Sequence, residues 1–122
     1  MIQHKMMPAA GYAAMDAGIR FAVRVLHAAG IDTCQSCQGG AGHPYSEPTV
    51  EMVAGADGAE GFAALAALSA YGLAVAEVAQ IWHVKNGLPY EKLWRITFTK
   101  SFEDRADEQP QFVFGYDNEW KP

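Results

Sequence analysis

The chain has 122 residues and a net charge of −5, with half of its residues apolar and 19% charged. This length fits one domain and allows a hydrophobic core that needs neither disulfides nor metal. An acidic chain without a basic stripe argues against direct nucleic-acid binding, because phosphate neutralisation supplies most of that affinity. No stretch reaches the about 18–20 uninterrupted apolar residues of a membrane helix. The N-terminus also lacks a secretion signal, so we expect a cytoplasmic protein.

The charge is concentrated at the C-terminal end. Residues 101–122 hold six acidic and two basic side chains, a net charge of −4, while the preceding hundred residues are nearly neutral. We expect one domain over 1–122, with residues 1–10 as a loose arm and 101–122 as an acidic extension. The extension either faces a basic partner or is a solvated end that aids solubility.

The first half of the chain predicts one helix followed by two short strands. Residues 11–29 carry apolar side chains at three- and four-residue spacing, which is typical of an amphipathic helix. Gly30 is placed to end this helix in a left-handed conformation. Short strands are then expected over 31–34 and 49–53, joined by a loop over 35–47 that is rich in helix and strand breakers.

A second helix is expected to follow and to end at Tyr71. Asp57 and Glu60 have the spacing of a capping box, in which each residue's side chain bonds the other's backbone N–H. Gly72 would close the helix. The side chains expected in the core from this helix are Phe62, Leu65, Ala66 and Leu68.

The rest of the sequence predicts a hairpin. Residues 74–85 alternate between apolar and polar side chains, with Val78, Trp82 and Val84 expected on one face. Asn86-Gly87 is a strong two-residue turn signal, and 92–100 would be the return strand. A last strand is expected near 112–116. The order predicts an α+β two-layer sandwich, in which two helices pack on a mostly antiparallel sheet of four to five strands.

The segment from Thr33 to Pro44 carries the residues most suited to chemistry. One interpretation is a ligand-binding loop, because glycines allow close backbone approach and can aim N–H groups at an anion. No lysine follows the glycines and no helix starts after them, so the segment matches neither phosphate-binding fingerprint. The expected ligand-binding residues are Thr33, Ser36, Cys37, Gly39, Gly40, Gly42, His43, Glu47 and Arg95.

Three other interpretations of the same segment stay open. Zinc would use Cys34, Cys37 and His43, but a structural zinc site needs four ligands and no second cysteine pair follows. Thiol catalysis would use Cys37 as the nucleophile and His43 as its base. Alternatively, the glycines form only a tight crossover, and the cysteines are small buried hydrophobic residues.

Six segments of the chain carry a distinctive pattern: Leu26–Thr33, Ser36–His43, Glu47–Val50, Tyr71–Val75, Trp82–Gly87 and Trp94–Phe98. On these segments the sequence resembles a group of small bacteriophage and prophage proteins. The resemblance covers about 26–98 and implies a bacterial host cell as the setting, without implying an activity. It also implies that Cys37, more than Cys34, belongs to a common pattern.

Three functions therefore compete. The first is a non-enzymatic binding protein that holds a small, nucleotide-like ligand in the loop at 36–43. The second is an inhibitor or adaptor that acts on a host defence complex through the acidic extension. The third is a small zinc- or thiol-dependent enzyme built on Cys37 and His43. We expect no cofactor for the first two functions, and zinc is the one left open for the third.

Overall fold

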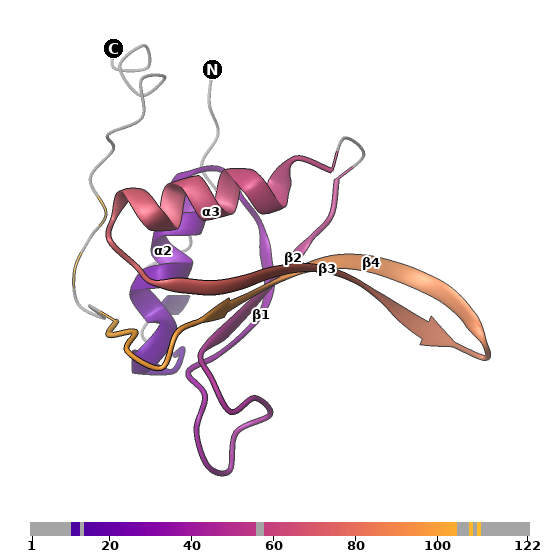
Figure 1. Ribbon diagram of the computed structural model, residues 1–122, viewed down its shortest axis with the longest axis horizontal. Coiled ribbons are helices and arrows are strands. Elements are labelled where there is room, and N and C mark those ends of the chain that lie inside the picture. The colour runs from indigo at the N-terminus through magenta and orange to yellow at the C-terminus, as the bar shows by residue number, and fades with distance from the viewer. Residues whose placement is uncertain (1–10, 13, 56–57, 105–107, 109, 111–122) are drawn as a thin grey trace.

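The computed structural model describes residues 11–12, 14–55, 58–104, 108 and 110. Four strands form one antiparallel sheet in the order β1-β2-β4-β3. The helices lie on one side of this sheet, as Figure 1 shows, which confirms the α+β two-layer prediction. The elements in chain order are η1 (Ala17–Ile19), α2 (Arg20–Ala28), β1 (Thr33–Cys37), β2 (Thr49–Val53), α3 (Glu60–Ala70), β3 (Val75–Lys85) and β4 (Leu88–Phe98).

The core fills the space between the helices and the sheet. Alternate residues of the two central strands point toward the helices, as the period of two in a strand requires. Their side chains are fully buried beside apolar side chains of both helices. The central members of this core are Val50, Met52, Ile96, Phe98, Phe21, Leu26 and Leu68.

The predicted helix over 11–29 is not continuous, because it is interrupted at 14–16. Asp16 has an extended backbone with ψ of 131°, and only the short 3-10 turn η1 separates it from α2 at Arg20. The N-terminus of α2 is capped from a distant part of the chain. Both carboxylate oxygens of Asp104 accept backbone N–H groups, from Phe21 at 2.7 Å and from Ala22 at 3.1 Å. The C-terminus follows the prediction, because Gly30 has a φ of +83°.

Helix α3 ends as predicted but presents a different face to the sheet. Gly72 has a φ of +75° beyond its C-terminus. Phe62 is 69% exposed and Ala66 is also exposed, so their predicted burial is wrong. The reason is that Gly61 packs on Trp94, where an added Cβ would lie 2.5 Å from the ring. Asp57, the expected cap, lies outside the described residues.

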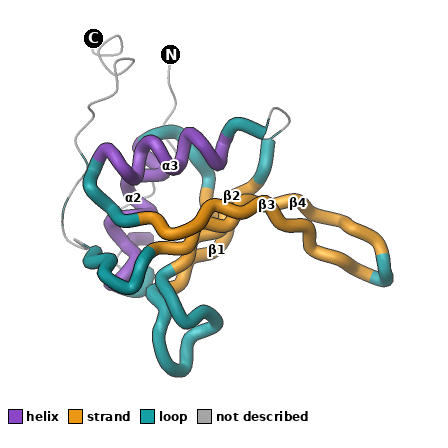
Figure 2. The backbone as a smooth tube through the Cα atoms, viewed as in Figure 1, coloured by secondary structure: helices purple, strands orange, loops and turns teal. Residues whose placement is uncertain are grey.

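The β3–β4 hairpin projects beyond the helices, as Figure 2 shows. Asn86 and Gly87 both have positive φ, 53° and 79°, as this turn requires. The return strand begins at Leu88 and not at residue 92, because a two-residue turn pairs the strands at once. Trp82 is 54% exposed because no helix covers this part of the hairpin.

Some expectations fall on residues that the structure does not describe. These are the arm at 1–10, the last strand near 112–116 and most of the acidic extension. Within the described part of the chain, no helix has the length and apolar character needed to cross a bilayer.

Candidate functional site

The glycine-rich segment leaves the end of β1 and returns at the start of β2, where Cys37 pairs with Thr49. Figure 2 shows it as a loop that projects from the side of the sheet opposite α3. Its two limbs meet at Gly39, which has a φ of +82°. A Cβ on Gly39 would lie 2.6 Å from the Pro48 nitrogen, so only glycine fits without displacing backbone.

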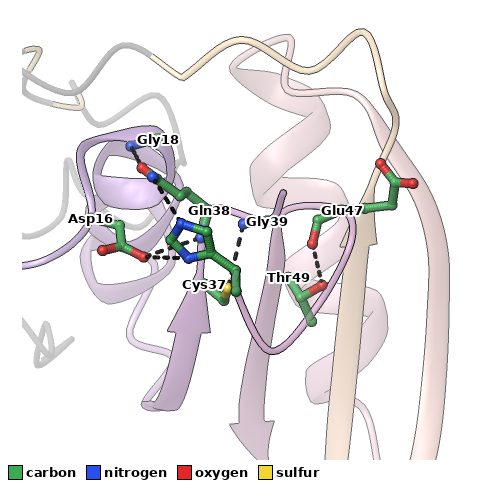
Figure 3. Close-up of polar contacts among 8 residues, drawn as sticks. Asp16, Gly18, Cys37, Gln38, Gly39, Glu47 and Thr49 are labelled. Atoms are coloured by element: carbon green, nitrogen blue, oxygen red, sulfur yellow. Dashed lines mark hydrogen bonds and ion pairs between the residues drawn. The ribbon is translucent and has the colours of Figure 1, made fainter. Parts of the chain in front are cut away.

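Three donors of different chemistry converge at the base of this loop. One metal-ligating atom from each of Asp16, Cys37 and His43 lies within 4.8 Å of the other two. Nδ1 of His43 is 3.8 Å from Oδ2 of Asp16. The Cys37 thiol is 3% exposed and accepts the N–H of Gly39 at 3.4 Å, as Figure 3 shows. The side chains of His43 and Asp16 are 31% and 42% exposed, so solvent reaches the cluster from their side.

Gln38 holds the segments of the cluster together. Its Oε1 accepts the N–H of Gly18 at 2.9 Å, and its own N–H lies 3.4 Å from Oδ2 of Asp16. Because Oε1 accepts from a backbone donor, the amide nitrogen faces Nε2 of His43 at 3.4 Å. Nε2 must then be the acceptor, and the proton of the neutral imidazole sits on Nδ1, toward Asp16.

A buried ion pair anchors the far limb of the loop. Glu51 is 2% exposed on the face of the sheet away from the helices, and both Nε and Nη2 of Arg95 lie 3.0 Å from its Oε2. The Tyr45 hydroxyl donates to the same oxygen at 2.8 Å. Burial raises the pKa of Tyr45, and the hydrogen bond to Glu51 raises it further, so the hydroxyl remains a donor.

Cys34 is separate from the cluster. It is exposed, and its thiol donates to the backbone carbonyl of Glu51 at 3.4 Å. Partial desolvation of the sulfur and the negative charges of Glu51 and Glu91 raise the pKa of this thiol. The thiolate form that metals and electrophiles require is therefore disfavoured at Cys34.

The structure divides the predicted ligand-binding residues into two groups. Cys37, Gly39 and His43 come together, while Arg95 is bound to Glu51 on the sheet. Thr33 lies at the other end of β1, where its Oγ1 is 2.8 Å from Nε2 of His27.

The remaining predicted residues lie around the loop without joining the cluster. Ser36 and Glu47 are half-buried, and Figure 3 shows the Glu47 side chain directed away from Asp16 and Cys37. Gly40 and Gly42 have positive φ and open space around them. Gly40 donates its N–H within the loop, to the carbonyls of Tyr45 and Ser46.

Sequence reasoning missed Asp16 and Glu51. Asp16 fell inside the helix predicted over 11–29, although aspartate is a preferred N-cap residue and could have indicated that a helix starts after it. Glu51 lies between two apolar residues in β2, and Arg95 lies between two apolar residues in β4. Two opposite charges in apolar strands are a signal for a buried ion pair.

In comparisons with known proteins, no protein-family model, curated protein or solved structure matches this chain.

Proposed function

We propose that this chain is a small-ligand-binding protein whose site is the cluster of Asp16, Cys37 and His43. The observation that carries the proposal is the convergence of a carboxylate, a thiol and an imidazole within 4.8 Å. This donor set suits a divalent ion such as Zn²⁺, which binds oxygen, nitrogen and thiolate sulfur. A phosphate group placed directly on these three residues would meet the Asp16 carboxylate, which disfavours it.

The geometry favours an open zinc site over a closed one. Three protein ligands leave a fourth position for water or a small molecule, as in catalytic zinc sites. Tetrahedral zinc holds neighbouring ligand atoms about 3.3–3.8 Å apart, given bond lengths of about 2.0–2.3 Å. The cluster would therefore contract by about 1 Å on binding. The ion would also displace the proton on His43 Nδ1.

A nucleotide-like molecule is the second candidate ligand, and the conformation of the loop favours it. Gly40 and Gly42 hold positive φ, and a Cβ added at either position would meet nothing within 4 Å, so their backbone is open to close approach. Such a ligand could complete the fourth position of the metal. In the phage setting that the sequence resemblance implies, the protein would then sequester a metabolite or signal of the host.

Thiol catalysis has less support. Cys37 is 3% exposed, so an external substrate could not reach its sulfur without movement of the loop. The adaptor hypothesis depends on the acidic extension, which lies mostly outside the described residues.

The test of metal binding is a calorimetric titration of Zn²⁺ into chelator-treated protein, with native mass spectrometry to count the ions. We expect one zinc per chain. Cys37→Ser and Asp16→Asn should each weaken binding by at least about tenfold, since each removes a charged ligand. Cys34→Ser is the matched control and should bind like the wild type. Absence of binding, or equal loss in both cysteine variants, would refute the proposed site.

The test of the second ligand is a thermal-unfolding screen of nucleoside phosphates, with and without Zn²⁺. A ligand at a hundred times its dissociation constant adds about 2.7 kcal/mol to the free energy of unfolding. We expect a shift that needs zinc and is lost in Cys37→Ser. If no compound shifts the unfolding temperature, nucleotide binding is excluded. The metal site would still be decided by the zinc titration.

A further inference from the structure

Strand β3 forms one edge of the sheet, since the order is β1-β2-β4-β3. It is 11 residues long, and its stretch from Val78 to Val84 contains no acidic residue, lysine or arginine. Natural edge strands are commonly kept short or blocked by charges, prolines or bulges, because an unpaired edge is a template for another strand. A long edge of this composition is therefore suited to strand pairing.

The same stretch is regular enough to pair. Near the hairpin tip the register shifts between His83 and Val84, and the extra residue, Tyr90, lies in β4 and not in β3. At the other end the shift lies before Glu77. The segment from Glu77 to Lys85 is thus an unbulged run of β3 along an edge that no strand of the described residues pairs with.

We propose that two copies of this chain pair through this segment, antiparallel and with Ile81 opposite its own copy. This register places Glu77 of each chain directly opposite Lys85 of the other, and both side chains are exposed. Two opposite-charge pairs then flank the interface. On the other face, Val78 lies opposite Val84. Directly opposed strand residues are the pairs that stabilise a sheet, so the strand is complementary to itself.

The exposed apolar side chains of the hairpin favour the same arrangement. Trp82 and Val84 are 54% and 62% exposed, and they alternate with Val78 on the face that carries the helices. In the pair, the hairpin of each chain extends along the β3 edge of the other chain's sheet. The face of the hairpin that carries Trp82 and Val84 is then on the same side of the joined sheet as α3 of the other chain. The exposed residues of α3 are apolar except for one serine: Phe62, Ala63, Ala66, Ser69 and Ala70. The two apolar surfaces would cover each other.

The test is the oligomeric state of the full chain by sedimentation equilibrium over a range of concentrations. We expect a dimer for the wild type. Glu77→Lys and Lys85→Glu should each raise the dimer dissociation constant by at least about tenfold, because both attractive pairs become repulsive. Lys100→Glu makes the same charge change as Lys85→Glu at a position outside the sheet, so it is the control and should dimerise like the wild type.

Mixing the two single variants gives the sharpest result. In a mixed dimer, the lysine introduced at position 77 of one chain faces the glutamate introduced at position 85 of the other, and the unchanged Lys85 and Glu77 also face each other. We therefore expect the mixture to dimerise more tightly than either variant does alone. Circular dichroism checks that each variant is folded. A monomeric wild type, a dimer that the single changes do not weaken, or a mixture that stays monomeric would each overturn the proposal.

Discussion

At the scale of single residues, Gln38 determines which nitrogen of His43 is available. Its amide donates to Nε2 and so favours the proton on Nδ1, which a metal ion would have to displace. Gln38→Glu would offer an oxygen that accepts an Nε2–H, as in carboxylate–histidine–zinc sites. We predict that this change tightens zinc binding by about tenfold, measured by calorimetry. Weaker binding than in wild type would contradict this account of the tautomer.

His27 is a buried histidine whose pKa is lowered, mainly by desolvation and against an opposing effect of Asp32. Its ring nitrogens contact the Tyr12 hydroxyl and Thr33 Oγ1 at 2.9 and 2.8 Å. The unfolded state therefore binds a proton more readily than the folded state. The free energy of unfolding should fall as the pH drops below about 6.5, by at most about 1.4 kcal/mol per pH unit, until the folded-state pKa is passed.

Urea unfolding of wild type and His27→Gln between pH 5 and pH 8 checks this prediction. The variant should be less stable at pH 8, because it loses a well-placed ring, and its stability should depend less on pH. Equal slopes for the two proteins would show that His27 does not cause the pH dependence.

At the scale of secondary-structure elements, the ion pair between Glu51 and Arg95 joins β2 to β4, and Tyr45 joins the loop to both. Among the described residues, Arg95→Met would leave the buried Glu51 carboxylate with the Tyr45 hydroxyl as its remaining side-chain donor. We predict a loss of about 1–3 kcal/mol in the free energy of unfolding, below the range for fully buried pairs because Arg95 is one-third exposed.

Chemical denaturation measures this loss, and Lys100→Met is the control for removing a surface positive charge. A double change, Glu51→Gln with Arg95→Met, should cost less than the sum of the two single changes, since the pair acts as a unit. Additive costs would contradict a direct interaction.

At the scale of the whole molecule, local patterns predicted the elements but not the contacts between them. The Asn86-Gly87 turn, the two helix-ending glycines and the alternation over 74–85 are short-range signals, and they were enough to predict the two-layer fold. The start of α2 could not be predicted in this way, because its cap, Asp104, comes from more than 80 residues away.

The same limit applies to the candidate site. Cys37 and His43 were predicted because they share one loop, whereas Asp16 comes from the segment before η1 and reaches them only through tertiary packing. The expected metal set of Cys34, Cys37 and His43 relied on spacing alone. In β1 the register shifts between Thr33 and Gln35, and Cys34 contacts β2 instead of the loop.

The most direct test of the central claim is the absorption spectrum of the chain titrated with Co²⁺, a spectroscopic substitute for zinc. We predict an intense thiolate-to-cobalt charge-transfer band that saturates at one ion per chain, persists in Cys34→Ser and disappears in Cys37→Ser. This pattern would show that Cys37 binds the metal, as the cluster with Asp16 and His43 requires. A spectrum that shows only hydrated cobalt, or a band that depends on Cys34, would contradict the proposed site.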